Sequence, residues 1–239
     1  MENRKAGLFV TGTDTDAGKT VVAATIARLL NRTGTTRVGV YKPVASGGPA
    51  AAGQGDGAVL WEAAGRPLDA ALVCPQAFQT PLAPHHAARI EGRRVDETRL
   101  RTGIDPWLAA SDVVLIEGAG GLFSPISQRL LNADLARDFA YPLILVDAGR
   151  LGCVGRVLAT MIAATASRLD VRAVVLSQVE ADQQPPSGSP TSPARIIADG
   201  AAELRLRLPD VEVTILPHGG DDFTPSIDWM RLARPACPP

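Results

Sequence analysis

Short runs of apolar residues alternate with longer stretches rich in Ala, Leu and Val along most of the chain. The short runs are bounded by Gly or by polar residues, which is typical of buried strands. They predict strands at 6–11, 37–41, 113–116, 143–146, 171–176 and 211–216. The longer stretches predict helices at 19–32, 56–64, 99–110, 132–140, 153–169 and 196–206, with a further one from His85. Strands that alternate with helices favour a mostly parallel central sheet flanked by helices.

The segments between these elements carry turn-forming residues. Gly, Ala, Ser and Pro are dense at 43–57, and Pro, Ser and Gln are dense at 182–193, so both are predicted to be loops, the second a mobile one. Residues 73–92 are predicted to be irregular apart from the helix at His85. The Pro-rich C-terminal tail is predicted to be irregular from about residue 222. The length of 239 residues suits one α/β domain, so 1–239 is predicted to be a single domain.

Composition and charge exclude several classes of protein. Aromatic residues make up only 4% of the chain, so the core is expected to consist mainly of Ala, Val, Leu and Ile. The formal net charge of -1 provides no broad basic surface, which disfavours nucleic-acid binding. Cys74, Cys153 and Cys237 are far apart, which disfavours zinc and a disulfide framework and fits a reducing compartment. The first apolar run is too short for a signal peptide or a membrane span, so we expect a cytoplasmic protein with no membrane partner.

The most specific motif is Gly12-Thr13-Asp14-Thr15-Asp16-Ala17-Gly18-Lys19-Thr20, between a predicted strand and a predicted helix. This is the context of a phosphate-binding loop (P-loop), in which backbone N–H groups and a helix N-terminus hold phosphate oxygens. Lys19 would reach the β- and γ-phosphates of a nucleotide, and the Thr20 hydroxyl would bind Mg²⁺. Thr13 stands where the first glycine of the common pattern is expected. The alternative is a strand-to-helix turn without a ligand.

Three charged residues at strand or helix ends could complete this site. Glu117 follows a predicted buried strand and precedes a glycine run, the position of a second Mg²⁺-binding carboxylate in many P-loop enzymes. Asp56 fits a metal ligand and a helix N-cap equally well. Lys42 follows the second strand and could stabilise charge on a transferred phosphoryl group. The alternatives are a solvated carboxylate at Glu117 and a surface lysine at Lys42.

Weaker candidates lie elsewhere in the chain. His85 and His86 are adjacent, but such pairs cap or pack more often than they catalyse. Asp147 follows a strand and could either face the site or simply end the strand. Cys153 begins a predicted helix, where the pKa of a thiol can fall, although a small buried residue is the more common interpretation.

Several segments together resemble one enzyme family. The motif at 10–20 is similar to the opening of the dethiobiotin synthetases, and so are the segments at 41–47, 84–85, 117–121, 143–146 and 151–153. The resemblance extends to about Pro217 and covers most of the chain. It implies a P-loop NTPase fold and an ATP-dependent ligase of biotin biosynthesis. Enzymes of this family use CO₂ and ATP to close a ureido ring on 7,8-diaminopelargonate.

The resemblance also implies roles for individual residues. Lys19 and Lys42 would bridge a substrate carbamate and the γ-phosphate. Thr15 and Ser46 would contact the head of the substrate, with Thr15 counted as catalytic. Mg²⁺ would be held by Thr20, Asp56 and Glu117. The wider nucleotide site matches Asp16, Ala17, Gly18, Lys19, Thr20, Val21, Asp56, Glu117, Gly118, Ala119, Gly120, Ser177, Gln178, Pro217, His218 and Gly219.

In this family the acid tail of the substrate binds a helix N-terminus of the second subunit. Gly152, Cys153 and Val154 match that position, so a homodimer is implied.

The chain departs from the family pattern at three places. Asp16 stands where many members carry Glu, which shortens its reach. Ser177-Gln178 replaces an Asn-Asp pair that reads the nucleotide base, and a serine offers only one hydroxyl for this task. Gly155 occupies a position that is often Asn near the substrate carboxylate. These departures leave base preference and tail binding open.

Three other classes of protein share parts of the pattern. Partition and division-site ATPases of the ParA/MinD type carry a signature lysine early in the P-loop, where this chain has Asp14. Amidoligases of the cobyrinic acid diamide synthase type usually add a glutaminase domain, for which the chain is expected to be too short. A related synthetase that acts on another diamine remains the third alternative.

Overall fold

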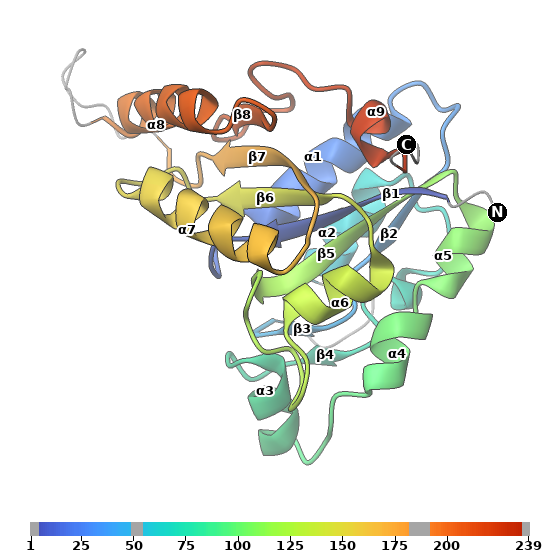
Figure 1. Cartoon of the computed structure of the whole chain (residues 1–239). Coiled ribbons are helices and arrows are strands. Elements are labelled where there is room, and N and C mark those ends of the chain that lie inside the picture. Colours follow the sequence, from blue (N-terminus) through green and yellow to red (C-terminus); the bar gives the residue numbers. More distant parts are fainter. Residues whose placement is uncertain (1–4, 49–54, 182–191, 236–239) are drawn as a thin grey trace.

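The computed structural model describes residues 5–48, 55–181 and 192–235. Its centre is a six-stranded sheet in the order β2-β5-β1-β6-β7-β8, in which every neighbouring pair of strands is parallel (Figure 1). The strands are β1 (Ala6–Gly12), β2 (Val38–Tyr41), β5 (Val113–Gly121), β6 (Leu143–Asp147), β7 (Val171–Ser177) and β8 (Glu212–Leu216). A separate short pair is formed by β3 (Ala45–Ser46) and β4 (Ala77–Phe78). The mostly parallel α/β fold predicted from the sequence is confirmed.

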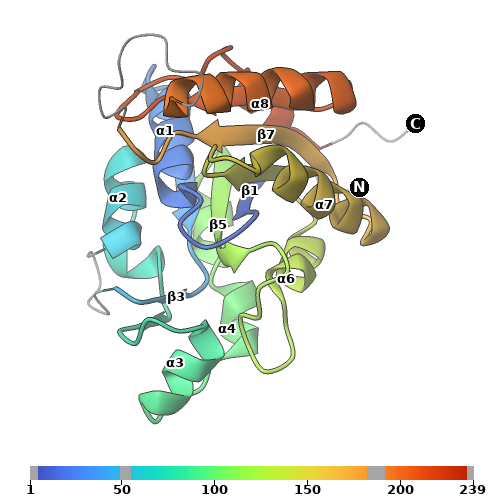
Figure 2. The same ribbon diagram turned by 90° about the vertical axis from the view of Figure 1, so that its left-hand side faces the viewer.

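Helices cover both faces of the sheet. One face carries α1 (Lys19–Asn31) and α2 (Gly55–Ala63), and the other carries α6 (Asn132–Phe139) and α7 (Cys153–Ala166) (Figures 1 and 2). The remaining helices lie at the edges or ends of this framework: α3 (Pro84–Ile90), α4 (Glu97–Thr102), α5 (Asp105–Ala110), α8 (Pro193–Arg207), α9 (Trp229–Ala233) and the 3₁₀ turn η1 (Ala70–Leu72). Within the described residues, no helix combines the length and the apolar character needed to cross a membrane.

The core is built mainly from aliphatic strands, as the composition predicts. The small residues Ala23, Ala24 and Ala27 of α1 are buried, which lets the helix approach the sheet closely. The few aromatic residues nevertheless matter, because Trp107 and Tyr41 are among the largest fully buried side chains. Both find hydrogen-bond acceptors: Trp107 Nε1 donates to Leu72 O at 3.2 Å, and the Tyr41 hydroxyl donates to main-chain oxygens of α4. Buried aromatic groups with a polar atom normally need such partners.

Two predicted element boundaries are wrong, and the structure shows why. The strand predicted at 113–116 continues through Glu117 to Gly121, because Gly121 still pairs with Gly12 of β1. The helix predicted at 99–110 is two helices, α4 and α5, separated at Gly103 and Ile104. Pro106 lies in the first turn of α5, where the missing N–H of proline has no helical partner to lose.

The C-terminal region is more ordered than the sequence predicts. Instead of an irregular tail from about residue 222, Thr224 forms a bridge with Ile215 of β8, and α9 follows. Trp229 and Leu232 of α9 are buried. The helix contacts β1 and α1, so this segment is part of the core. Most of the loop predicted at 182–193 lies outside the described residues, and α8 already begins at Pro193 with Ser192 as its N-cap.

Candidate active site

The phosphate loop joins the end of β1 to the start of α1. Gly18 is the N-cap of α1 and has a φ of 90°, a left-handed conformation that favours glycine. A Cβ atom at this position would lie 2.4 Å from Ser177 Oγ, so the backbone also approaches β7 too closely for a side chain. The turn can therefore present its N–H groups and the first turn of α1 to a phosphate group.

Lys19 and Thr20 follow this turn and point toward the carboxyl end of β5. The Lys19 ammonium donates to the carbonyl oxygen of Asp14 at 3.0 Å, which places it across the loop. Burial lowers the pKa of Lys19, and Glu117 opposes this effect. The Thr20 hydroxyl donates to Glu117 Oε1 at 2.8 Å.

Lys42 lies between two carboxylates. Its Nζ is 2.5 Å from Glu117 Oε1 and 2.6 Å from Asp56 Oδ2. Lys42 and Glu117 are almost completely buried, with 4% and 1% of their surface exposed, which excludes a surface lysine and a solvated carboxylate. Burial disfavours the charged form of Lys42, but the two carboxylates outweigh it, and the pKa of Lys42 is raised. The group is therefore a stable cation inside the protein.

The residues around this cation fit a divalent metal such as Mg²⁺. Thr20, Asp56 and Glu117 supply one hydroxyl and two carboxylates within reach of one another. Glu117 Oε2 is buried and has no hydrogen-bond partner in the described part of the chain, so a ligand for it is chemically favoured. Residues 5–48, 55–181 and 192–235 hold no group of three or more His, Cys, Asp or Glu that could bind a metal. Mg²⁺ needs no such group, because it is usually held by one or two carboxylates together with substrate phosphates.

These groups line a cleft of about 830 Å³ at the carboxyl ends of the strands. Twelve of its lining residues were predicted from the sequence: Thr15, Asp16, Gly18, Lys19, Thr20, Val21, Lys42, Ser46, Asp56, Glu117, Ala119 and Gly120. Another wall includes Pro84, from the 84–85 segment of the family resemblance, and residues that sequence reasoning missed, namely 81–83, Ser124 and Pro125. For residues 81–83 the signal was the proline-rich character of the segment before α3.

The glycine run after Glu117 is fixed by one buried side chain that sequence reasoning also missed. Asn132, the first residue of α6, donates its amide to Ala119 O and, at 3.0 Å, to Gly121 O. Its Oδ1 accepts from Ala119 N at 3.3 Å. The Ser124 hydroxyl accepts from Gly121 N at 2.9 Å. The backbone beside the cleft therefore has a defined conformation, although it is rich in glycine.

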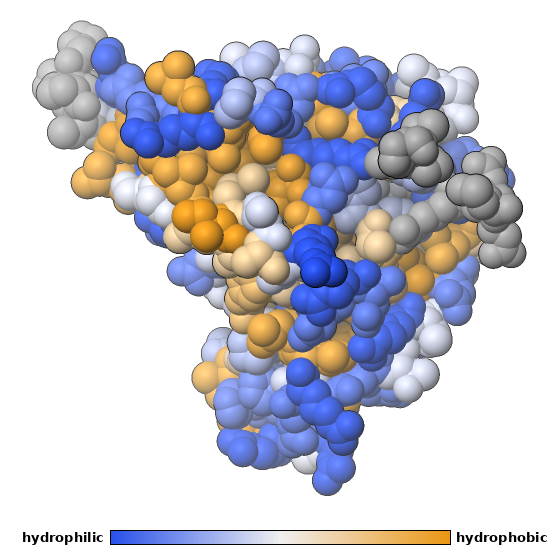
Figure 3. Space-filling model, viewed as in Figure 1, coloured by the Kyte–Doolittle hydropathy of each residue, from blue (hydrophilic) through white to orange (hydrophobic). Residues whose placement is uncertain are grey.

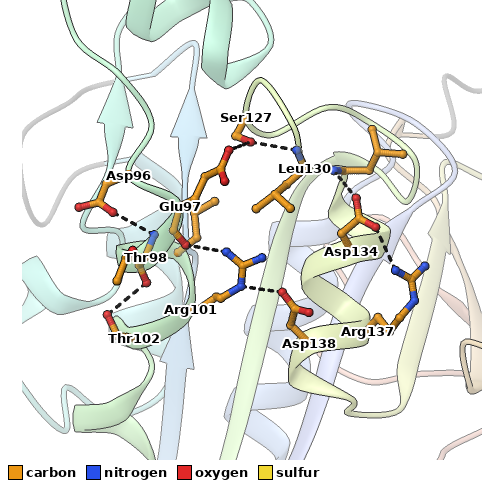
Figure 4. A network of polar contacts seen from close by, with 12 residues as sticks. Asp96, Glu97, Thr98, Arg101, Thr102, Ser127, Leu130, Asp134, Arg137 and Asp138 are labelled. Carbon is orange, nitrogen blue, oxygen red and sulfur yellow. Dashed lines mark hydrogen bonds and ion pairs between the residues drawn. The ribbon is translucent and has the colours of Figure 1, made fainter.

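A polar network outside the cleft holds the segment that carries this wall. The Ser127 hydroxyl donates to Glu97 Oε1 of α4 at 2.6 Å, and Arg101 of α4 pairs with Asp138 of α6 at 2.6 Å (Figure 4). Asp134 accepts from the backbone of residue 131 and stabilises the start of α6. The network joins α4, the 122–131 segment and α6 into one support.

Of the residues predicted to surround the nucleotide base, Ser177 lies next to the phosphate loop, and none of 177–178 or 217–219 lines the main cleft. Gln178 N donates to Leu216 O at 2.9 Å, and His218 Nδ1 lies 3.3 Å from Gln178 O, which brings β7 and the 217–219 segment together. Gln178 also lines a smaller cavity of about 180 Å³ with residues 148–151, 179–180, Pro193 and Ile196. Ser177 packs against Gly18, at a distance that leaves no room for a Cβ atom at position 18.

The predicted tail site at the start of α7 stands apart from the main cleft. None of the described residues that line that cleft comes from 152–154. Gly152, the N-cap of α7, has a φ of 86°. Cys153 is buried, and burial raises the pKa of its thiol, so Cys153 is a packed residue and not an activated nucleophile. Residues 152–154 therefore do not line the cleft of their own chain.

Comparisons with known proteins identify the family of the chain. The family model described as an AAA domain matches residues 6–214. The ATP-dependent dethiobiotin synthetase BioD of Rhodopirellula baltica is 44% identical over 186 residues, which cover 72% of each chain. BioD of Aromatoleum aromaticum is 35% identical over 214 residues, which cover 88% of this chain and 89% of that protein.

Among solved structures, the cell division protein FtsY of Thermotoga maritima matches with a TM-score of 0.50 and 15% sequence identity, covering 98% of this chain and 68% of that one. At this identity the match shows only the shared fold. The two BioD proteins cover more than two thirds of the chain at over 30% identity. The chain therefore belongs to the dethiobiotin synthetase family.

Proposed function

We propose that this protein is an ATP-dependent dethiobiotin synthetase, which closes a ureido ring on 7,8-diaminopelargonate with CO₂ and ATP in biotin biosynthesis. The observation that carries the proposal is the buried Lys42 ammonium beside Glu117, at the mouth of a phosphate loop whose Thr20 contacts the same carboxylate. A fixed cation next to the γ-phosphate position is what transfer of a phosphoryl group to an oxyanion requires. Family membership supplies the substrate.

The proposed reaction has three steps. One amine of the diamine adds to CO₂ and loses a proton, giving a carbamate. A carbamate oxygen then attacks the γ-phosphorus of ATP and ADP leaves, giving a carbamic–phosphoric anhydride. The second amine attacks the carbonyl carbon, the C–O bond to phosphate breaks, and a second proton is released as the ring closes. Activation by ATP is needed because the carbamate carbon is a poor electrophile.

Each step assigns a task to residues of the cleft. Backbone N–H groups of the phosphate loop would hold the β-phosphate, with Lys19 across it. Lys42 would lie between the carbamate and the γ-phosphate and balance the negative charge of both. Thr15 and Ser46 line the cleft and would contact the head of the diamine. Orientation of the carbamate in line with the γ-phosphate would supply much of the acceleration.

The proposed metal site uses the hydroxyl and the two carboxylates described above. Thr20, Asp56 and Glu117 would hold Mg²⁺, which would neutralise charge on the β- and γ-phosphates.

A homodimer is part of the proposal. Leu151, in the turn before α7, and Ile162, within α7, are 81% and 72% exposed. Apolar side chains gather over this helix on the surface (Figure 3), and such patches commonly mark protein–protein contacts. In a dimer that buries this face, residues 152–154 of one subunit could reach the tail of a substrate held in the other.

The dimer proposal predicts a mass in solution twice that of one chain, measured by light scattering after size-exclusion chromatography. An Ile162→Asp variant should run as a monomer, because a buried charge without a partner is costly at an interface. Leu206→Asp is the matched control, since Leu206 is 79% exposed on α8 and should tolerate the change. A monomeric mass for the unaltered protein at micromolar concentration would contradict the dimer proposal.

The competing interpretation as a switch ATPase has little support in the loop itself. Asp14 occupies the position of the signature lysine, and its carboxylate accepts from Thr15 N at 2.7 Å, within the same loop. A cytoplasmic location is proposed with the synthetase function, in keeping with the free thiols of Cys74 and Cys153.

The test of the proposed function is the release of ADP from Mg²⁺ and ATP, with and without bicarbonate and 7,8-diaminopelargonate. We expect ADP release to depend on both additions and to match the amount of dethiobiotin detected by mass spectrometry. Omission of either one is the control. Hydrolysis of ATP that ignores the diamine would instead indicate a switch ATPase. Release that requires a different diamine would indicate a related synthetase.

A further inference from the structure

Asp147 forms a set of contacts that the proposed reaction does not use. It ends β6, is completely buried, and accepts four hydrogen bonds. The Thr13 hydroxyl donates to Oδ2 at 2.7 Å and Gly149 N donates to Oδ1 at 2.9 Å. Arg156 of α7 donates from Nε to Oδ2 at 2.8 Å and from Nη2 to Oδ1 at 2.9 Å. Asp147 is thus neither a free catalytic group nor only the end of a strand.

The Arg156 guanidinium also holds the turn between β6 and α7. Its Nη1 donates to Leu151 O at 3.2 Å, and its Nη2 lies 3.4 Å from Arg150 O. A two-point contact of Arg with a carboxylate fixes direction as well as distance. Two side chains therefore connect the start of the phosphate loop, the 148–152 turn and the first turn of α7.

Thr13 is the point at which these contacts reach the nucleotide site. Its backbone N–H donates to Val146 O at 2.9 Å, and its carbonyl oxygen lies so close to Gly121 that a Cβ atom there would be 3.0 Å away. The next residue, Asp14, supplies the carbonyl oxygen that receives the Lys19 ammonium. A shift of Thr13 would therefore move both the phosphate loop and the position of Lys19.

We propose that Arg156 is a positioning residue for nucleotide binding, which acts through Asp147 to hold Thr13 at the start of the phosphate loop. Asp147 is inaccessible to solvent, and its other two donors are uncharged, so Arg156 supplies the positive charge that balances it. Without that charge, the buried carboxylate has a strong tendency to recruit water or another donor and to release Thr13. The inference rests on the nucleotide-binding part of the proposed function.

The test measures the affinity for MgADP by isothermal titration calorimetry and the KM for ATP in the synthetase assay. Arg156→Met, which keeps an unbranched apolar stem but removes the charge, should weaken MgADP binding about tenfold and raise the KM for ATP by a similar factor. The kcat at saturating ATP should stay within about threefold, since Arg156 lies outside the reacting groups. Arg156→Lys should recover part of the affinity, because it restores the charge but not the two-point contact.

A double-mutant cycle separates this role from a general loss of structure. Thr13→Val should weaken MgADP binding to a similar degree. The MgADP affinity of the double variant, Thr13→Val with Arg156→Met, should be within about twofold of that of the weaker-binding single variant. Arg207→Met is the matched control, because Arg207 is also a helical arginine paired with a carboxylate, Glu203 on α8. Its MgADP affinity should equal that of the unaltered protein.

Two outcomes would overturn the proposal. One is an Arg156→Met variant that is folded by circular dichroism and binds MgADP as the unaltered protein does. The other is a pair of single effects that multiply in the double variant, which would show independent action. If Arg156→Met does not fold, Thr13→Val and Arg156→Lys decide the question, because both variants keep the charge balance of Asp147. Unchanged MgADP affinity in both of these variants would also overturn the proposal. If the unaltered protein binds MgADP but forms no dethiobiotin, while Arg156→Met still weakens MgADP binding, the result contradicts the synthetase function alone and supports the positioning role of Arg156.

Discussion

A Lys42→Met variant is expected to lose about a thousandfold in turnover while it still binds MgADP. The reason is that Lys42 would contribute its positive charge where charge changes during phosphoryl transfer, whereas the phosphate loop would hold the nucleotide without it. The measurement is dethiobiotin formation under single-turnover conditions, with MgADP affinity determined separately by calorimetry. Turnover equal to that of the unaltered protein would remove Lys42 from the mechanism.

Stability must be separated from catalysis in this experiment. The side chains of Lys42 and Glu117 are 5% and 1% exposed, so loss of the lysine leaves a buried carboxylate without its ion-pair partner, although the Thr20 hydroxyl and the charge of Lys19 remain near it. Breaking such a pair by removing one partner costs about 3–5 kcal/mol. Lys42→Met with Glu117→Gln should recover most of the melting temperature but none of the activity. Lys5→Met is the control, because Lys5 donates to a main-chain oxygen, Ser111 O, and lies just before the start of β1, away from the cleft.

A Gly18→Ala variant is expected to bind MgADP at least about a hundredfold more weakly, because phosphate binding needs several backbone donors in one arrangement. The φ of 90° strains any L-residue, and the new Cβ would lie 2.4 Å from Ser177 Oγ. Ser177 Cβ, on a strand of the central sheet, would also be 2.9 Å away, so we expect the loop to shift and its N–H groups to move with it. Calorimetric titration with MgADP gives the affinity directly.

Gly34→Ala separates loop geometry from backbone strain. Gly34, beyond the other end of α1, also has a positive φ of 66°, but nothing lies within 4 Å of a Cβ placed there. We expect Gly34→Ala to lose about 1 kcal/mol of stability and to keep its nucleotide affinity. Equal MgADP affinity in Gly18→Ala and the unaltered protein would show that the close contact with Ser177 does not shape the loop.

The sequence predicts the parts of this fold that depend on local information. The strands at β1, β6 and β8 follow from short apolar runs, and the helix at α1 follows from an Ala-rich stretch after a glycine. The phosphate loop is equally local, because its chemistry resides in consecutive residues from Gly12 to Thr20. Boundaries fail where pairing between distant strands overrides local preference, as at the glycine end of β5.

The support of the site depends on contacts between distant residues, and the sequence could not predict them. Thr13 and Asp147 are 134 positions apart, and Lys42 and Glu117 are 75 apart. The role of Asn132 depends on the path of the backbone at Ala119, which no motif records. Arg156 resembles any helical arginine until β6 brings Asp147 beside it. Residue type suggested that Lys42 and Glu117 are functional, but only the fold reveals that they are paired.

Glu117 and Asp56 lie in different structural settings, although both are proposed to bind the same metal. Glu117 lies within a hydrogen-bonded strand and pairs in register with Val10 of β1. Asp56 lies in the first turn of a short helix, with half of its side chain in solvent. Evolution or design can therefore alter the carboxylate at position 56 with little effect on the sheet. A substitution at position 117 disturbs the core itself. A change of metal preference or substrate is therefore easier to obtain by substitutions in α2, at position 56, than at position 117.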